Sequence, residues 1–261
     1  MSSLYVNNIN STQSAINTSL KKIATGSQYP SAQYGAAAYS ILTNMYSNIG
    51  TLSQSNSNTQ TANAMLATAA GGVSSTVDAL GSLQQTLQQA ANGTNNSADL
   101  ANLSKTVSQT LSQVNENAAV QFNGQNLLDG SQTLTVAGDN GYTNISIGNM
   151  TAQGLGLTDA NGNSNVNLNS ISDALSTVSN AYEKALSEST KLGTAQQGLS
   201  YESANYTTQE ENLTAAASTM GDTDIASEVT KLKSSQTQQQ FALYAAKMNM
   251  HNRGAVLSLL Q

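Results

Sequence analysis

Apolar residues recur at intervals of three, four or seven positions near both ends of this chain. Near the start they are Val6, Ile9, Ile16, Leu20 and Ile23. Near the end they are Ile225, Val229 and Leu232 and, more loosely spaced, Phe241, Met248, Leu257 and Leu260. Such spacing places side chains on one face of an α-helix. Because neither helix can bury this face alone, we predict that the two pack together or against other copies, with these residues forming the interface.

Three further stretches show helical periodicity between the two ends. The first covers about residues 39–91, after a break at Gly26 and Pro30, and an unbroken helix of about 50 residues would be about 75 Å long. Gly71 and Gly72 lie inside it, and each costs roughly 1 kcal/mol relative to alanine, so we expect a kink or weak point there. The second stretch has the clearest stripe, which comprises Leu100, Leu103, Val107, Leu111, Val114, Ala118 and Phe122. A third starts near residue 170, and a final helix starts after residues 221–224.

The centre of the chain changes to a two-residue alternation. Leu134 and Val136 alternate with threonine, and Ile145 and Ile147 alternate with asparagine and serine. The intervening Asp139-Asn-Gly141 is a hairpin-turn sequence, so we predict a small β-hairpin. The order of helices, small β insert and helices predicts a mainly α fold, an elongated antiparallel bundle of long helices.

Charge is scarce in this sequence of 261 residues, a length that allows one or two domains. Charged residues make up 9% of the chain, against about 25% in a typical domain, and residues 23–77 contain none. A solvated monomer normally carries charge over such a length. This composition favours a surface that ends up against protein; a merely neutral surface rich in serine and asparagine is the alternative.

The charge and hydropathy patterns argue against two classes of partner. The net charge is −6 and Arg253 is the single arginine, whereas binding to nucleic acid requires several cations on one face. No apolar run approaches the roughly 18 residues of a membrane span, so we expect no membrane partner. The start of the chain lacks the features of a cleaved signal peptide, so export would use a route that reads no such peptide.

No group of residues predicts catalysis or a bound cofactor. His251 is the only histidine and cysteine is absent, whereas a metal site needs several ligands. Helix solubility and capping explain Glu210-Glu211, Asp222 and Asp224 better than acid–base chemistry does. The glycines of residues 154–162 lack the strand–loop–helix arrangement of a phosphate cradle. We therefore expect a protein that is not an enzyme.

Several segments, in the right order, resemble bacterial flagellin. At the start they are Asn7-Asn-Ile-Asn10, Gln13-Ser-Ala15, Leu20, Gly26, Ala36-Ala37 and Ile41. In the middle they are Ala91-Asn-Gly-Thr-Asn95 with Asp99-Leu100, and Gln121-Phe-Asn-Gly124. At the end they are Asp224-Ile-Ala-Ser-Glu-Val229 and Val256-Leu-Ser-Leu-Leu260. The resemblance covers about the first 130 and the last 90 residues.

The resemblance implies a structural subunit that polymerises with itself into the helical tube of the extracellular flagellum. It implies export by the flagellar type III apparatus, with an export chaperone, a cap and junction proteins as partners. It also implies terminal helices that pair as a coiled coil inside the filament. This paired inner core domain would comprise residues 1–40 and 222–261. A helical rod domain would comprise residues 41–221 and include a β-hairpin region at about 131–167. The centre is too short for the usual outer domains, so we expect a thin, smooth filament.

Two segments depart from the flagellin pattern. The loop after the first helix, residues 27–35, has lost every charge that flagellins typically carry there and contains a proline, so its contacts cannot be the usual ion pairs. In flagellins that activate the innate-immune Toll-like receptor, arginine and leucine stand at the positions of Ser82 and Thr86, and glutamate at that of Thr106. Leu83 and Leu87 belong to the same segment. Losing a charge-assisted contact costs about 1.5–3 kcal/mol, so we expect weak or absent receptor activation.

Two other functions remain open. The chain could be a hook–filament junction protein, although the closing Leu-Ser-Leu-Leu-Gln favours a filament subunit. It could also be a flagellin-like secreted adhesin, since exposed hydroxyl and amide side chains can carry or bind glycans. Possible O-glycosylation sites near the hairpin are Ser131, Thr133, Thr143, Ser146 and Thr151. Plain solvated hydroxyls are the simpler interpretation of these residues.

Overall fold

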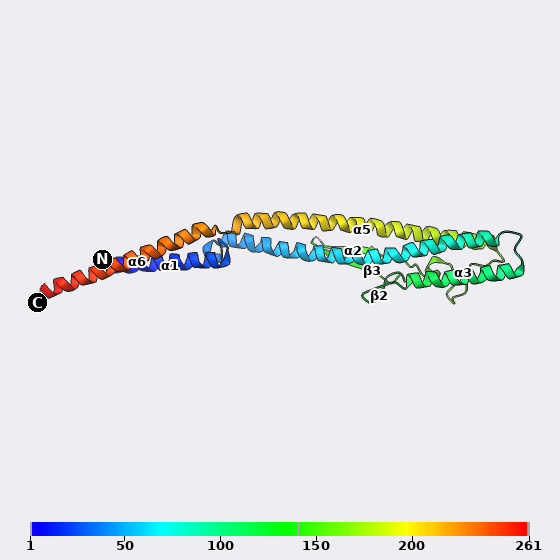
Figure 1. Ribbon diagram of the computed structural model, residues 1–261, viewed down its shortest axis with the longest axis horizontal. Helices are drawn as coiled ribbons and strands as arrows, with labels where there is room; N and C mark the ends of the chain where they lie inside the picture. The colour runs from blue at the N-terminus through cyan, green and yellow to red at the C-terminus, as the bar shows by residue number, and fades with distance from the viewer. Residues whose placement is uncertain (1, 140, 260–261) are drawn as a thin grey trace. The chain divides into compact units, whose positions relative to one another are not determined.

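Long helices make up most of the computed structural model of this chain (Figure 1). The structure describes residues 2–139 and 141–259, with side chains for 4–139 and 141–255. The helices are α1 (Ser2–Thr25), α2 (Ala36–Ala90), α3 (Ser97–Ala118), α4 (Ala152–Leu155), α5 (Ile171–Gly221) and α6 (Ile225–Leu259), with a 3₁₀ turn, η1, at Ala32–Tyr34. The strands are β1 (Gln121–Phe122), β2 (Gln125–Asn126), β3 (Thr133–Gly138) and β4 (Gly141–Ser146). The mainly α fold predicted from the sequence is confirmed.

The chain forms two compact units. The terminal unit comprises Met1–Gly50 and Glu210–Gln261, and the central unit comprises Thr51–Gln209. Within the described part of the chain, no helix is long and apolar enough to cross a membrane.

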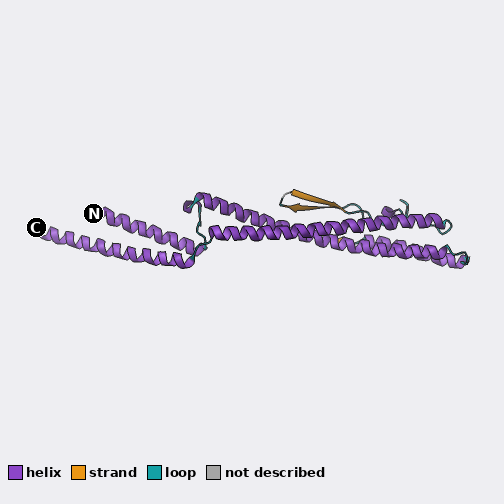
Figure 2. Ribbon diagram, turned by 90° about the horizontal axis from the view of Figure 1, so that it is seen from above, coloured by secondary structure: helices purple, strands orange, loops and turns teal. Residues whose placement is uncertain are grey.

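The central unit has a continuous apolar core built by three longer helices, the short α4 and the β segments. Residues of α2, α3 and α5 contribute to it, among them the fully buried Leu83, Val114 and Val178. Side-chain hydrogen bonds between Asn56 and Ser203 and between Asn63 and Ser200 show that α2 and α5 run antiparallel. Figure 2 shows these long helices side by side, with the β3–β4 hairpin lying along them.

The α2 helix continues without interruption through Gly71 and Gly72. The expected weak point is therefore not a break in the helix, and close packing explains one of the two glycines. A Cβ atom on Gly72 would lie 2.7 Å from Cδ1 of Leu128 and 2.8 Å from the carbonyl oxygen of Asn117. Gly71 faces open space. Only the absence of a side chain at Gly72 lets the end of α3 and the following loop approach α2 this closely.

Local signals explain how α3 begins and ends. The Asn96 side chain accepts hydrogen bonds from the N–H groups of Ala98 and Asp99, and the Asp99 carboxylate accepts one from the N–H of Asn96, which is a capping box. The helix ends at Ala118, so the sequence prediction that Phe122 continues its apolar stripe was wrong. Phe122 instead lies in β1 and packs against the core from there.

A tight hairpin follows α3 and explains the Gln-Phe-Asn-Gly segment. Asn123 and Gly124 both have positive φ, at 51° and 78°. This combination is typical of a two-residue type I′ turn, in which asparagine and glycine are the favoured pair. The turn joins β1 to β2, and Phe122 pairs with Gln125.

The predicted central β-hairpin is confirmed. β3 and β4 pair antiparallel from Thr133 opposite Ser146 to Gly138 opposite Gly141. Val136 and Ile145 are buried against the helices, whereas Thr133 and Thr135 on the other face are exposed. The two-residue alternation in the sequence therefore reports which face of the hairpin meets the core.

Substituting alanine at Gly72 should destabilise the central unit, because the added methyl group would overlap Leu128 and the α3 backbone. We expect a loss of about 1–3 kcal/mol in unfolding free energy, measured by urea denaturation followed with circular dichroism. Gly71→Ala is the matched control, since its side chain enters open space and alanine favours the helix by up to about 1 kcal/mol. Equal effects of the two substitutions would contradict the packing role of Gly72.

Candidate functional site

The first and last long helices lie side by side in the terminal unit. The hydroxyl of Ser19 in α1 donates a hydrogen bond to Glu228 in α6 at 2.8 Å. Further along, the amide of Gln239 donates to Gln13 at 2.6 Å. One residue number rises as the other falls, so α1 and α6 run antiparallel, as both figures of the fold show.

The contact between these helices follows a seven-residue repeat. In α1 the positions of low exposure that follow this repeat are Tyr5, Ile9, Thr12, Ile16, Ser19 and Ile23. In α6 they include Glu228, Leu232, Ser235, Gln239, Ala242, Ala246 and Asn249. Steps of alternately four and three residues are the pattern of a coiled-coil seam. We call these thirteen residues the terminal seam.

The terminal seam is poor in large apolar side chains, above all on α6. There, Leu232 is accompanied by alanine and polar residues, so little apolar area is removed from water when the helices pair. Burial contributes only about 25 cal/mol for each Å² of apolar surface. Pairing of α1 with α6 therefore leaves much of the apolar surface of these helices exposed to water.

The structure divides the predicted interface residues into two groups. Ile9, Ile16, Ile23 and Leu232 lie in the terminal seam, and Val229 beside it is half-buried. The second group is at least 43% exposed and comprises Val6, Leu20, Ile225, Phe241 and Met248. Leu257 and Leu260 lie outside the residues whose side chains are described. The residues predicted as one interface thus include some that pack between α1 and α6 and others that face solvent.

Among the large exposed apolar residues described for α1 and α6, sequence reasoning missed four, which are Leu4, Leu243, Tyr244 and Met250. Leu243, Tyr244 and Met250 line a shallow groove of about 390 Å³ along α6, together with Lys247. The seven-residue interval between Leu243 and Met250 was the available signal. It was hidden because the residues between them match no single helical stripe.

Exposed apolar side chains occur on opposite sides of α6. At 3.6 residues per turn, Leu243 and Met250 lie to one side of the terminal seam, and Phe241 and Met248 lie to the other. All four are exposed. A helix with apolar side chains on two sides, besides the face that meets α1, can contact two further neighbours at once.

One carboxylate is buried in the terminal seam. Glu228 is 5% exposed; it accepts hydrogen bonds from Ser19 and, at 3.2 Å, from the ammonium group of Lys231. Burial raises the pKa of Glu228, but the hydrogen bonds from Ser19 and Lys231 and the charges of Lys231 and Lys22 more than offset this effect. The pKa of Glu228 therefore lies below its ordinary value of 4.5.

The two connections of the terminal unit are joined by backbone pairing. The N–H of Gln28 donates to the carbonyl of Gly221 at 2.6 Å, and the N–H of Thr223 donates to the carbonyl of Gly26 at 2.9 Å. Gly221 packs against Leu42, where a Cβ atom would come within 3.0 Å of the leucine side chain. The uncharged loop thus makes backbone contacts within its own chain where flagellins typically carry charges.

A tyrosine ring and a cation complete the same loop. The ring of Tyr29 lies so close to Gly35 that a Cβ atom there would be 2.8 Å from it, and Gly35 has a φ of 154°. The ammonium group of Lys21 lies 6.0 Å from the centre of the Tyr34 ring. Aromatic contacts of this kind are weak but do not require an acidic partner.

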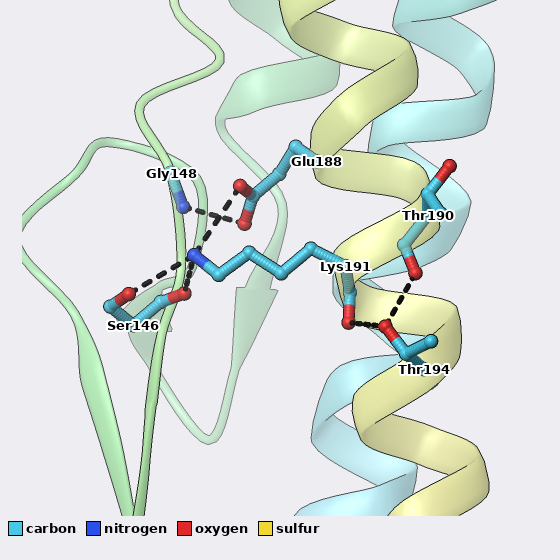
Figure 3. Close-up of polar contacts among 6 residues, drawn as sticks. All are labelled: Ser146, Gly148, Glu188, Thr190, Lys191 and Thr194. Carbon is cyan, nitrogen blue, oxygen red and sulfur yellow. Dashed lines mark hydrogen bonds and ion pairs between the residues drawn. The ribbon is translucent and has the colours of Figure 1, made fainter.

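In the central unit, the base of the β-hairpin is fixed to α5 by a buried carboxylate and a lysine (Figure 3). The carboxylate of Glu188 accepts a hydrogen bond from the N–H of Gly148 at 2.8 Å and lies 3.5 Å from the ammonium of Lys191. Lys191 donates to both the backbone oxygen and the hydroxyl of Ser146. These contacts hold the end of β4 in a fixed position on the helix.

A second polar contact fixes the tip of the hairpin. The hydroxyl of the buried Tyr206 donates to Glu202 at 2.7 Å and accepts from the N–H of Asp139 at 3.2 Å. Burial raises the pKa of Tyr206, and the hydrogen bond with Glu202 raises it further. Both ends of the hairpin are thus bound to α5, so the hairpin has a fixed position on that helix.

The five hydroxyls considered for glycosylation differ in availability. Ser131 donates to Asp129 at 2.6 Å, Ser146 accepts from Lys191, and Thr151 both donates to Asn149 and caps α4. Thr133 and Thr143 are exposed on the hairpin strands. They are the more accessible of the five hydroxyls.

The segment compared with receptor-binding flagellins offers few contacts to a partner. Leu83 and Leu87 are fully buried in the core. The hydroxyls of Ser82, Thr86 and Thr106 donate to carbonyls of their own helices. These five positions therefore present no charge and little apolar surface.

Two family models match the chain, one at each end. The bacterial flagellin N-terminal helical region matches residues 1–133, and the bacterial flagellin C-terminal helical region matches residues 175–260. Both family models describe helical regions, which agrees with the long helices that the structure has in the matched residues.

Curated relatives fall into two groups by length. The flagellar filament 30.7 kDa core protein of Treponema maltophilum is 29% identical, with 94% of this chain and 93% of the relative aligned. Flagellin FlaB2 of Treponema pallidum is 27% identical, with 96% and 94% aligned. The flagellin of Serratia marcescens is 30% identical over 58% of this chain, but the alignment spans only 44% of the Serratia protein.

Solved structures show a similar fold. A putative flagellar hook-associated protein from Vibrio parahaemolyticus has a TM-score of 0.61 at 15% identity, covering 72% of this chain and 99% of that one. Bacillus cereus flagellin has a TM-score of 0.50 at 23% identity, covering 62% and 94%. At these identities the likenesses concern the fold alone.

Acidification should loosen the pairing of α1 and α6 through Glu228. Since its pKa in the pair lies below the ordinary 4.5, the carboxylate stabilises pairing above that value, and this contribution is lost as the pH falls through the depressed pKa. Glu228→Gln should therefore flatten the pH dependence of pairing below 4.5, measured by hydrogen exchange of the α1 amides. Glu211→Gln, at an exposed carboxylate, is the control. Identical pH profiles for Glu228→Gln and the unmodified chain would contradict this role.

Proposed function

The chain belongs to the bacterial flagellin family, as its sequence predicts, and we propose that it is the structural subunit of a flagellar filament. In this role it polymerises with copies of itself into a helical tube. The family has a structural role, and within the described residues no cluster of acidic, histidine or cysteine side chains could hold a metal ion.

One observation carries the proposal, which is the exposed apolar surface on two sides of α6. Phe241 and Met248 lie on one side, and Leu243 and Met250 lie on the other. A single copy leaves both sides in water, so both gain from contact with other copies. Two different contacts of this kind are heterologous, and heterologous contacts that do not close into a ring generate an open helical polymer.

The chain has little sequence available for outer domains. The N-terminal family match ends at residue 133 and the C-terminal match starts at 175, which leaves residues 134–174 between them. This intervening segment contains nearly all of the β3–β4 hairpin, the short α4 and the start of α5. The alignment with the Serratia flagellin spans less than half of that protein, whereas both Treponema proteins are aligned nearly in full. A thin filament with a smooth surface follows.

The remaining partners follow from family membership. The subunit leaves the cell through the flagellar type III apparatus, delivered by an export chaperone, and assembles beneath a cap onto junction proteins. Its place is then the extracellular flagellum. In the filament, residues 1–40 and 222–261 form the inner core, and residues 41–221 form the layer around it.

A junction protein has the weaker support of the two structural roles. The likeness to the Vibrio hook-associated protein, at 15% identity, concerns the fold alone. The flagellin family models match both ends of the chain, and the filament core protein of Treponema maltophilum aligns over most of its length. These matches favour a filament subunit over a junction protein present in few copies.

Removing the apolar side chains on one side of α6 should prevent polymerisation and leave the subunit folded. We expect the Phe241→Ser, Met248→Ser double variant to form no filaments in salt-induced assembly, as seen by electron microscopy, because one of the two heterologous contacts is lost. The control is Gln236→Ser with Gln238→Ser, two exposed polar positions of the same helix.

A truncation that lacks residues 222–261 should also remain monomeric, because it lacks all of α6. Circular dichroism of every variant would show that the central unit keeps its helices. Filaments from the truncated chain, or from the double serine variant at the yield of its control, would contradict the proposal.

Activation of the innate-immune receptor should be weak or absent. Ser82, Thr86 and Thr106 lack the charged and apolar groups of receptor-activating flagellins, and losing one charge-assisted contact costs about 1.5–3 kcal/mol. Purified monomer applied to receptor reporter cells should therefore give little signal at concentrations where an activating flagellin saturates the response. Full activation by this monomer would refute the expectation.

A further inference from the structure

We propose that Glu228, through its hydrogen bond with Ser19, sets the register in which α1 and α6 pair. This inference deepens the proposed function, because filament subunits can contact one another regularly only if every copy pairs its terminal helices in the same way. Glu228 acts as a positioning residue within the terminal seam and need not touch a neighbouring copy.

Apolar packing in the terminal seam is a poor guide to register. Ile9, Ile16 and Ile23 follow one another at intervals of seven residues, so a slide by one repeat replaces one isoleucine with another. The facing positions of α6 include Ala242 and Ala246, whose small side chains fit against any of them. A polar contact between particular residues is therefore needed to distinguish the registers.

Only the observed register gives Glu228 a suitable hydroxyl partner. A slide by three or four residues would bring the buried carboxylate against Ile16 or Ile23, which have no donor. A slide by seven in one direction would bring it to Thr12, whose hydroxyl already donates to the carbonyls of Asn8 and Ile9, both at 2.9 Å. In these registers the buried carboxylate would keep Lys231 of its own helix as a donor but would lose the hydrogen bond from Ser19, so they are penalised.

In the other direction, a slide by seven residues would bring Glu228 to Gly26, beyond the end of α1 at Thr25. Gly26 has no side chain that could donate a hydrogen bond, and its carbonyl accepts one from the N–H of Thr223 in the observed register. That backbone pair, with the one between Gln28 and Gly221, brings the ends of the two helices together but does not depend on side-chain identity. Glu228 is therefore the first contact after these connections that distinguishes one residue of α1 from the next.

The chain has no cysteine, so pairs of introduced cysteines can report the register directly. Gln13→Cys with Gln239→Cys reports the observed register, because these side chains meet. Asn10→Cys and Asn17→Cys, each combined with Gln239→Cys, report slides of three and four residues. The full-length chain is treated with a short bismaleimide under assembly conditions, and cross-linking within one chain is separated from cross-linking between chains by gel mobility.

With Glu228 intact, we expect the observed register to cross-link at least about tenfold more than either slid register, which is the effect of losing one hydrogen bond to a charged group. Glu228→Leu should lower this preference to about twofold or less. Glu228→Gln, which keeps an acceptor for Ser19, should retain most of the preference. Glu211→Leu, at an exposed glutamate of the terminal unit, is the control and should leave the preference unchanged.

If Glu228→Leu kept the tenfold excess of cross-linking in the observed register, or if Glu211→Leu removed this excess equally, contacts other than that of Glu228 would set the register. Equal cross-linking of all three pairs with Glu228 intact would also overturn the inference. Electron microscopy of the same samples tests the proposed function separately. A chain that keeps its register preference but never polymerises would refute the filament role and leave the register role standing.

Discussion

The structure depends on how little apolar surface the two terminal helices can hide from each other. Their shared seam contains isoleucine on one side but mostly alanine and polar residues on the other. Larger side chains, such as Phe241 and Met250, lie away from it and remain in water. Because burial of apolar area is the main favourable term in association, this surface favours contact with further copies over a solitary chain. The weak internal seam and the exposed apolar sides are thus two aspects of one arrangement.

The central unit has the opposite character. Its helices bury leucine and valine completely, and the hairpin covers part of that core through Val136 and Ile145. Polar contacts at both ends of the hairpin, centred on Glu188 and Tyr206, fix its position on α5. This unit therefore buries most of its large aliphatic side chains within a single copy. The chain therefore combines a central unit that has its own apolar core with terminal helices whose large apolar side chains stay exposed in a single copy.

Serine, threonine, asparagine and glutamine replace charge over much of the surface. Many of the hydroxyls on the helices donate to the carbonyl four residues earlier, as Ser82 and Thr86 do. Such side chains need neither solvent nor an ion partner, so they can be covered by protein at low desolvation cost. The loop after α1 likewise makes its contacts without ion pairs, since backbone hydrogen bonds and tyrosine contacts occur where flagellins typically carry charges.

The sequence by itself determined the long helices, a hairpin around Asp139-Asn-Gly141 and the flagellin family, because periodicity and turn residues are local signals. It did not determine where α3 ends, since the spacing of Phe122 matches a helix although Asn123 and Gly124 form a turn. Nor did it distinguish Ile16, which is buried, from Leu20, which is exposed, or reveal that Glu228 is buried beside Ser19. These distinctions depend on which side of each helix faces its partner, and residues more than 200 positions apart in the chain decide that.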